Sequence, residues 1–344
     1  MIATAGAAAT PHDYRDTNFD YFVAGDPTMP RAAHTQPGFA LMGGGGSVDA
    51  AFEFIATHAG HGHIVILAAV GDDHFEPEAR HYGDSFVRNW GPVASAQTLV
   101  FHNRNASYDA RVISALHGAD GIFLAGGDQA NYVRYWKGTP VQVALNLHVR
   151  SGRPIGGSSA GLAILGHYSY SALDGGSMES KVALADPYNS GITIETDFLH
   201  ARWLDHVITD THFSRRRRLG RLITFVARVN HDNSRANVFG VGVDEHSALL
   251  IGADGIGHVA DGSLGSAWLV MPHEQATVLT PGQPLSIRNI RLLRLDTSGS
   301  VDLGSGTVRR PAAEDTLSIA RGTLTGDSIA SPIIMRDVAP SDEE

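Results

Sequence analysis

The sequence contains no cysteine among its 344 residues. This absence excludes disulfide bonds, thiolate metal ligands and a cysteine nucleophile. No uninterrupted apolar run reaches the roughly 18 residues that a membrane-spanning helix needs, so we expect no membrane segment. Lysine is scarce as well, because only Lys137 and Lys181 among the 26 basic residues are lysines, a bias that we attribute to genome composition.

Positive charge is also in short supply, since the formal net charge is −10. Such an acidic chain argues against a general nucleic-acid-binding protein. The apolar fraction of 43% and the charged fraction of 18% are ordinary for a soluble globular protein. Residues 1–10 lack the basic region and long apolar stretch of an intact secretory signal. A secreted protein whose signal has been removed would look the same, so cytoplasmic and secreted locations both stay open.

Predicted strands and helices alternate from residue 38 onwards. The predicted strands are residues 38–42, 63–69, 97–101 and 121–125, and the predicted helices are 47–57, 77–90, 108–117, 129–136 and 141–149. Ser47 is the expected N-cap of the first helix. This alternation predicts an α/β fold in which helices flank both faces of a parallel sheet. In such sheets ligands bind at the carboxyl ends of the strands.

The second half of the chain is less regular. Its predicted elements are a polar insertion or lid loop (167–200), a strand (207–213), a helix (214–227), a β-hairpin (238–245 with 247–251) and short β-like runs (257–338). Ser214 is the expected N-cap of the helix. We take the final runs as an extension of the sheet and not as a separate catalytic domain.

Residues 152–165 predict a short strand, a glycine-lined turn and a helix that follows at once. A serine on so tight a corner exposes its hydroxyl, and the new helix points free backbone N–H groups toward whatever the serine attacks. This pattern is typical of a nucleophile elbow. The alternative is a tight crossover in which the serine is only an N-cap. A second glycine loop, residues 43–46, lacks the lysine of a P-loop and the spacing of a dinucleotide fingerprint, which disfavours phosphate binding.

A serine nucleophile needs a base, and the base needs an acceptor that orients it. His212 follows the elbow at a predicted strand end, and Glu245 lies at another strand end. The order Ser159, His212, Glu245 differs from that of α/β-hydrolases and indicates a distinct arrangement. Because the chain has 18 histidines, spacing alone leaves a surface or packing role for His212 open.

Four separated motifs resemble those of one enzyme family. They are Gly126-Gly-Asp-Gln129, Gly157-Ser-Ser-Ala-Gly161, Asp210-Thr-His-Phe-Ser214 with Arg216, Arg218 and Arg221, and Val243-Asp-Glu245. Their order and spacing resemble cyanophycinase, within the serine peptidase family that also holds the aspartyl dipeptidase peptidase E. The resemblance implies a flavodoxin-like parallel sheet flanked by helices, a fold shared with class I glutamine amidotransferases. We therefore expect an N-terminal arm (1–36), a cyanophycinase-like α/β catalytic domain (37–275) and a β-rich C-terminal extension of the same domain (276–344).

The resemblance also implies a role for each matching residue. The catalytic residues would be Ser159 as nucleophile, with Ser158 as the fallback, His212 as base and Glu245 as its orienting carboxylate. The oxyanion hole would be formed by the backbone N–H groups of Gly127 and Ala160. The substrate-binding positions would be Gln129, Asp210, Thr211, Arg216, Arg218 and Arg221. No metal or cofactor, no nucleic acid and no membrane would take part, and the protein would be a homodimer.

The implied substrate, cyanophycin, is a polyaspartate chain with an arginine on each β-carboxyl group, so every unit carries a carboxylate and a guanidinium. Arginine binds carboxylates bidentately, and Arg218 and Arg221 are spaced to share one helical face. Asp210 would pair with the substrate guanidinium or anchor one of these arginines, and the sequence leaves both open. Arg215 and Arg217 point elsewhere and are expected on a solvated face.

Thr211 departs from the family pattern, because a glutamine is usual at this position. The shorter side chain would enlarge the pocket or remove one hydrogen bond, so it bears on the substrate. The resemblance implies a serine exopeptidase that releases β-Asp-Arg dipeptides from cyanophycin through an acyl-enzyme. One alternative is an aspartyl dipeptidase or isoaspartyl peptidase that acts on short peptides. The other is a catalytically silent binding protein, which would be expected to lack a member of the triad.

Overall fold

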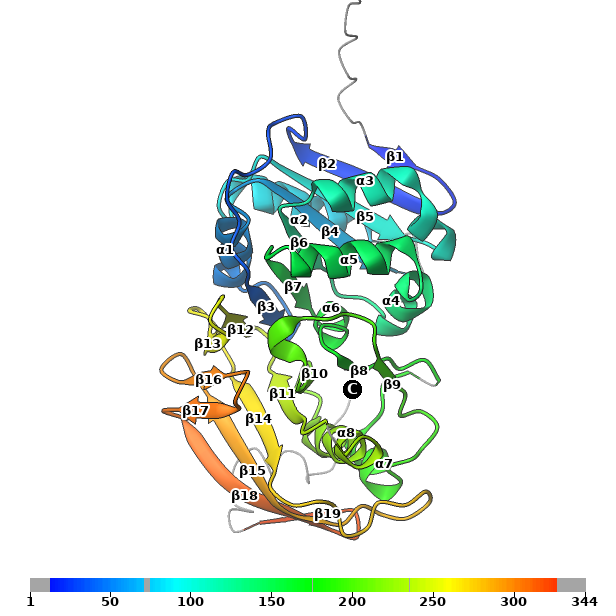
Figure 1. The fold of residues 1–344 in the computed structure, drawn as a ribbon, viewed down its shortest axis with the longest axis vertical. Coiled ribbons are helices and arrows are strands. Elements are labelled where there is room, and N and C mark those ends of the chain that lie inside the picture. The colour runs from blue at the N-terminus through cyan, green and yellow to red at the C-terminus, as the bar shows by residue number, and fades with distance from the viewer. Residues whose placement is uncertain (1–12, 71–74, 175, 235, 327–344) are drawn as a thin grey trace, which may run out of the picture.

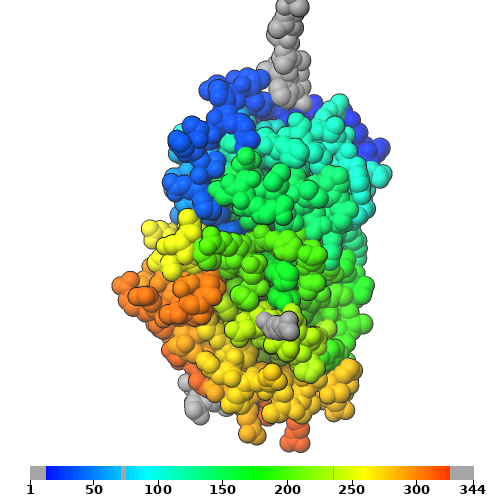
Figure 2. Space-filling view, viewed as in Figure 1, coloured from blue at the N-terminus to red at the C-terminus, as the bar shows by residue number. Residues whose placement is uncertain are grey.

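The computed structural model describes residues 13–70, 75–174, 176–234 and 236–326 (Figure 1). The strands of these ranges form two sheets, one of 11 strands and one of 8. Figure 2 shows the N-terminal segments, blue to cyan, at one end of the molecule and the C-terminal strands, yellow to orange, at the other. The middle of the chain, drawn in green, lies between them and connects the two halves.

Helices cover both faces of the first sheet. Its strand order is β1-β2-β5-β4-β6-β7-β3-β12-β13-β16-β17, and β5, β4, β6, β7 and β3 run parallel to one another. The strands are β1 (Tyr14–Arg15), β2 (Phe19–Gly25), β3 (Phe39–Met42), β4 (His63–Ala69), β5 (Ser95–Phe101), β6 (Gly121–Leu124), β7 (Ile155–Ser158), β12 (Ala248–Ile251), β13 (Ile256–Val259), β16 (Ser300–Asp302) and β17 (Thr307–Arg309). The helices around it are α1 (Asp49–His58), α2 (Glu76–Arg88), η1 (Arg104–Tyr108), α3 (Ala110–Gly118), α4 (Gln129–Trp136) and α5 (Pro140–Arg150).

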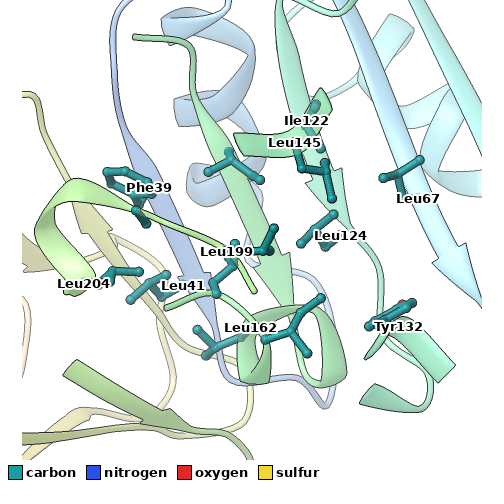
Figure 3. Close-up of a cluster of buried hydrophobic side chains, with 14 of the residues drawn as sticks. Phe39, Leu41, Leu67, Ile122, Leu124, Tyr132, Leu145, Leu162, Leu199 and Leu204 are labelled. Carbon is teal, nitrogen blue, oxygen red and sulfur yellow. The ribbon is translucent and has the colours of Figure 1, made fainter. Parts of the chain in front are cut away.

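Strand β4 shows why the layers form. All seven of its residues are buried, and successive side chains point to opposite faces of the sheet. Val65 and Leu67 pack in the cluster that contains α3, α4 and α5, whereas Ile64 and Ile66 pack with α1 and α2. Figure 3 shows part of the first cluster, with Leu67 beside residues of β6. The predicted class, a flavodoxin-like parallel sheet with helices on both faces, is confirmed.

The second sheet has the order β19-β18-β15-β14-β11-β10-β8-β9. Its strands are β8 (Tyr168–Tyr170), β9 (Ile194–Thr196), β10 (Val207–Asp210), β11 (Phe239–Val243), β14 (Ala267–Pro272), β15 (Ile287–Leu295), β18 (Ala313–Ala320) and β19 (Thr323–Gly326). Strands β8, β10 and β11 are parallel, and the remaining neighbours pair antiparallel. The apolar face of α8 (Leu219–Asp232) packs on this sheet together with α7 (Ser180–Ala185). The described ranges also contain two short helices, α6 (Ala160–Ala163) and η2 (Arg202–Leu204).

The predicted hairpin of residues 238–245 and 247–251 is wrong. Strand β11 lies in the second sheet, between β10 and β14, whereas β12 pairs with β3 in the first sheet. The chain therefore crosses from one sheet to the other between Val243 and Ala248. Two short apolar strands around a few polar residues suit both outcomes, and here pairing with distant strands determines the structure.

Two predicted helix caps are also wrong. Helix α1 begins at Asp49, and its N-cap is Val48, without a side-chain cap. Helix α8 begins at Leu219 with Arg218 as its N-cap, residues 213–217 form turns, and the amide of Ser214 donates to the carboxylate of Asp244.

The predicted insertion loop is not wholly irregular, since it supplies β8, α7 and β9. Strand β2 of the expected N-terminal arm pairs along its whole length with β5, and β14 and β15 pair across the expected boundary at residue 275. Residues 1–12 of the arm and 327–344 of the extension lie outside the described residues. The division into domains stays a prediction.

Among the helices of the described ranges, none has the length and apolar character to cross a bilayer.

Close packing at the start of α6 gives a stability prediction. A Cβ atom on Gly161 would lie 2.1 Å from the carbonyl oxygen of Leu124, so Gly161→Ala forces α6 away from β6. We expect the free energy of unfolding to fall by roughly 1–3 kcal/mol. The control is Gly118→Ala, where nothing lies within 4 Å of the new Cβ atom. Urea unfolding followed by circular dichroism measures both, and equal stabilities of the two variants would contradict the expectation.

Candidate active site

Ser159 lies on a sharp corner between the first sheet and a new helix. Strand β7 ends at Ser158, and α6 begins at Ala160. Ser159 has φ 52° and ψ −116°, a conformation that residues with a side chain rarely adopt. The amide of Ser159 donates to the carbonyl oxygen of Met42 at 3.1 Å. The predicted elbow is therefore present in the backbone, and the helix that follows is shorter than expected.

The structure brings Ser159, His212 and Glu245 into one hydrogen-bonded chain. Ser159 Oγ lies 2.7 Å from His212 Nε2, and His212 Nδ1 lies 2.6 Å from Glu245 Oε1. With the Nδ1 proton donated to the carboxylate, Nε2 is free to accept the serine proton. This arrangement can activate the hydroxyl for attack on a carbonyl group.

Adjacent strands explain how the base and the carboxylate meet. His212 follows β10 and Glu245 follows β11, and these two strands pair in parallel. Their carboxyl ends therefore lie at the same edge of the second sheet, facing Ser159 at the carboxyl end of β7. Ser158, the fallback nucleophile, lies within β7, and the hydrogen bond to His212 comes from Ser159.

The glycine loop 43–46 was missed by reasoning from the sequence, which considered it only as a phosphate cradle. A Cβ atom on Gly44 would lie 2.6 Å from His212 Cε1, and one on Gly45 would lie 2.7 Å from Glu245 Cβ. Both glycines have positive φ, at +94° and +80°. The backbone of the loop thus packs directly against His212 and Glu245, and side chains at Gly44 and Gly45 would clash with them. Its run of four glycines was the available signal.

The environment of His212 favours its neutral form. Burial lowers the pKa of His212, the hydrogen bond to Glu245 raises it, and the charges of Arg216 and Arg218 lower it again. The net result is a pKa below the usual value of 6.5. The ring can therefore act as a base at neutral pH.

The candidate oxyanion donors lie on either side of Ser159. Ala160 is the first residue of α6, directly after Ser159. Gly126 and Gly127 form the turn after β6, and a Cβ atom on Gly126 would lie 3.7 Å from Ser159 Cβ. The N–H groups of Ala160 and Gly127 therefore remain the candidate donors for an oxyanion at Ser159. Gln129 is half-buried and is the first residue of α4, which follows the turn at Gly126 and Gly127 in the chain.

Asp210 anchors two arginines. It is 2% exposed, and Arg221 binds both of its carboxylate oxygens, one of them through Nε at 2.7 Å. Arg218 Nη1 lies 3.3 Å from the same carboxylate. Both guanidinium groups also donate to Ser177 Oγ, at 3.1 and 3.0 Å. Of the two roles that the sequence left open for Asp210, these contacts favour the anchoring of arginines.

The cluster is buried and carries a net positive charge. Arg221 is 2% exposed and Arg218 is 7% exposed, and one carboxylate serves both. Burial lowers the pKa of Arg218 to about 10, and Asp210 acts in the opposite direction. The expected helical pairing of the arginines is wrong for Arg218, which precedes α8. The shared carboxylate, not helical spacing, brings the two side chains together.

Thr211 belongs to the same cluster. Its side chain is buried, and its Oγ1 accepts a hydrogen bond from Arg218 Nη1 at 2.9 Å. Arg216 is exposed and forms no ion pair within the described ranges, but it lies near enough to His212 to affect its pKa. Arg215 is exposed, as expected, whereas Arg217 is half-buried and its carbonyl oxygen accepts from Ser180 Oγ.

Reasoning from the sequence also missed the role of Asp244, which holds the backbone around the site. Its carboxylate accepts hydrogen bonds from the amides of Ser214 and Ser266, at 2.9 and 3.0 Å, and from Trp268 Nε1 at 3.0 Å. It therefore fixes the segment after His212 and the position of Glu245, its chain neighbour. In the described part of the chain, no group of three or more His, Asp or Glu side chains could hold a metal ion. The expectation that no metal or cofactor takes part stays a prediction.

The charge of Arg216 gives a pH prediction. Arg216→Ala removes a positive charge near His212, so the pKa of His212 should rise. Because the neutral ring is the base, reactivity appears as pH increases through this pKa, and the acidic limb should move to higher pH. The measurement is the rate of Ser159 labelling by a fluorophosphonate across pH. Arg215→Ala is the control, and an unmoved limb in Arg216→Ala would contradict the expectation.

Comparison with known proteins agrees with this geometry. The family model described as Peptidase family S51 matches residues 75–259. The cyanophycinase of Trichormus variabilis (strain ATCC 29413 / PCC 7937) is 31% identical over 217 residues, 61% of this chain and 66% of that protein. The cyanophycinase of Synechococcus elongatus is 32% identical over 224 residues, 63% of each chain. The matched segment thus spans just under two thirds of the length of these curated relatives.

A solved structure supports the fold. The crystal structure of a peptidase from an acI-B1 Actinobacterium superposes with a TM-score of 0.51 at 15% identity, covering 79% of this chain and 98% of that one. At this identity the likeness concerns the fold alone. The family model, in contrast, matches more than half of the chain, across the elbow, the histidine and the glutamate. The chain therefore belongs to peptidase family S51.

Proposed function

We propose that this protein is a serine peptidase that hydrolyses cyanophycin to β-Asp-Arg dipeptides. The observation that carries the proposal is the hydrogen-bonded chain from Ser159 Oγ through His212 to Glu245. Membership of the family and the names of the curated relatives support the substrate. Ser159 is the nucleophile, His212 the base and Glu245 the group that orients it.

The reaction proceeds through an acyl-enzyme. His212 Nε2 takes the proton of Ser159 as Oγ attacks the carbonyl carbon, and the imidazolium then donates this proton to the leaving group. The same histidine then takes a proton from water as the water attacks the ester carbonyl, and it returns this proton to Ser159 Oγ as the acyl–Oγ bond breaks and the carboxylic acid leaves. The N–H groups of Gly127 and Ala160 stabilise the oxyanion in both steps, and one such donor contributes roughly 3–4 kcal/mol.

Two sets of arginines contribute to substrate recognition: the exposed Arg216, and the buried Arg218 and Arg221. Arg216 is exposed beside the histidine, so it can bind a free carboxylate of the substrate directly. Gln129, on the other side of the turn at Gly127, supplies a neutral polar group. Asp210, Arg218 and Arg221 contribute a positive field from below the surface. Thr211 positions Arg218 through its hydroxyl.

One observation favours the runner-up, a dipeptidase or isoaspartyl peptidase on short aspartyl peptides. The side chain of Thr211 is buried and its hydroxyl oxygen accepts a hydrogen bond from Arg218, so Thr211 offers no exposed side-chain contact to a long substrate. The complete hydrogen-bonded chain at Ser159 speaks against a silent binding protein.

The homodimer is part of the proposal. Helix α5 presents Val143 and Leu147, 64% and 47% exposed, one turn apart on its outer surface, and such apolar residues suit a subunit interface. Light scattering after size-exclusion chromatography should give twice the chain mass of 36.5 kDa. A monomer at all concentrations would remove this part of the proposal.

The decisive experiment is hydrolysis of the polymer. The purified protein is incubated with insoluble cyanophycin, and mass spectrometry measures release of β-Asp-Arg. Ser159→Ala should abolish release, because it removes the nucleophile, with an expected loss of roughly 10⁴-fold or more. Ser158→Ala, the neighbouring serine, is the matched control and should retain activity. Cleavage of short isoaspartyl peptides without release from the polymer would favour the runner-up.

A further inference from the structure

The hydroxyl of Tyr132 lies beneath the turn that carries Gly127. Tyr132 is in α4 and is fully buried. Its Oη donates to the carbonyl oxygen of Ala125 at 2.6 Å and lies 3.1 Å from that of Gly126. Figure 3 shows the ring close to the end of β6, where Leu124 is labelled. The single hydroxyl proton of Tyr132 is therefore shared between two successive carbonyl oxygens of the turn, with the shorter contact to Ala125.

The direction of these carbonyl groups determines the direction of the next amide. In a trans peptide the N–H points opposite to the C=O. Because the Gly126 carbonyl points to Tyr132, the N–H of Gly127 points away from Tyr132. Ser159 lies on the other side of the turn, since a Cβ atom on Gly126 would be 3.7 Å from Ser159 Cβ, whereas one on Gly127 would be 3.4 Å from Tyr132 Oη. The N–H is thus aimed toward the side of the nucleophile.

A turn made of two glycines needs such a constraint. Glycine populates positive and negative φ about equally, so the peptide between Gly126 and Gly127 has little intrinsic preference for one orientation. Gly127 has φ +150°. The amide of Ala125 donates to the carbonyl oxygen of Leu67, which holds the start of the turn on β4. The carbonyl oxygens of Ala125 and Gly126 are contacted by the hydroxyl of Tyr132.

Tyr132 is itself rigid. Its ring stacks on Trp136 with centroids 4.5 Å apart and an interplanar angle of 17°. Burial raises the pKa of Tyr132, so the hydroxyl keeps its proton and remains a donor. Ring packing fixes where the oxygen lies, and the hydroxyl fixes the turn.

We propose that Tyr132 is a positioning residue for the oxyanion hole, which orients the Gly127 N–H toward the carbonyl oxygen of the substrate. The proposal rests on the proposed function, acyl transfer at Ser159. Tyr132 does not touch the substrate, so its effect concerns the transition state, in which the oxyanion develops, and not substrate binding.

The test is Tyr132→Phe, which removes the hydroxyl and keeps the ring. Tyr135→Phe, in the same helix, is the matched control. The first-order rate constant for phosphonylation of Ser159 by a fluorophosphonate should fall by about 10- to 100-fold in Tyr132→Phe, part of the loss seen when a whole donor is removed. The reagent concentration at half-saturation and the pH profile should stay unchanged, because His212 is untouched. Tyr135→Phe should match the wild type.

A simple packing defect would give a different pattern. It would reduce the fraction of molecules that become labelled, and the first-order rate constant, which refers only to folded molecules, would stay the same. A rate constant within twofold of the wild type, or a loss that appears only as weaker reagent binding, would overturn the role of Tyr132. If the wild type is not labelled, or Ser159→Ala is labelled equally, the proposed function itself fails and the role of Tyr132 fails with it.

Discussion

Three consecutive backbone carbonyls hold the site together. The oxygens of residues 42–44 accept hydrogen bonds from the amides of Ser159, His212 and His246, at 3.1, 2.8 and 2.8 Å. Ser159 belongs to the first sheet, whereas the two histidines follow strands of the second sheet. The distance between nucleophile and base is therefore set by one short segment that contacts both sheets. Glycine is needed at positions 44 and 45, because a side chain there would meet His212 or Glu245.

The buried carboxylates at the ends of β10 and β11 extend this constraint. Asp210 comes two residues before His212, and Asp244 comes directly before Glu245. Asp210 binds arginines around α8, and Asp244 binds the chain after His212 and strand β14. Removing one partner of such a buried charged contact typically costs about 3–5 kcal/mol, because the other is left unpaired. His212 and Glu245 are thus each preceded by a carboxylate that fixes the neighbouring backbone.

The sequence predicts the parts of this structure that local patterns determine. Six successive apolar residues in β4, Ile64 to Ala69, favour a strand buried on both faces, and the glycines around Ser159 favour a tight corner. His212 was one of 18 histidines, and only its resemblance to a family motif distinguished it. The hairpin and the Ser214 cap were predicted wrongly, and the packing of the glycine loop was missed, because the residues that they contact are distant in the chain. Ser214, for example, has the local signature of a cap, yet its amide is bound by a carboxylate 30 residues away.

The strained residues of the site are held by main-chain contacts, whereas the arginine cluster is held by side chains. Ser159, His212 and His246 have φ of 52°, 47° and 54°, and such conformations cost about 1–3 kcal/mol each. The backbone bonds to residues 42–44 offset this cost, so the catalytic geometry depends mainly on main-chain contacts. The arginine cluster, in contrast, is assembled from side chains such as Thr211 and Ser177. A substitution at Thr211 or Ser177 removes a hydrogen bond of Arg218 and leaves the carbonyls at 42–44 in place. Contacts of the arginine cluster can therefore change without touching the main-chain bonds that position Ser159 and His212, whereas a change of charge at Arg218 also acts on the pKa of His212.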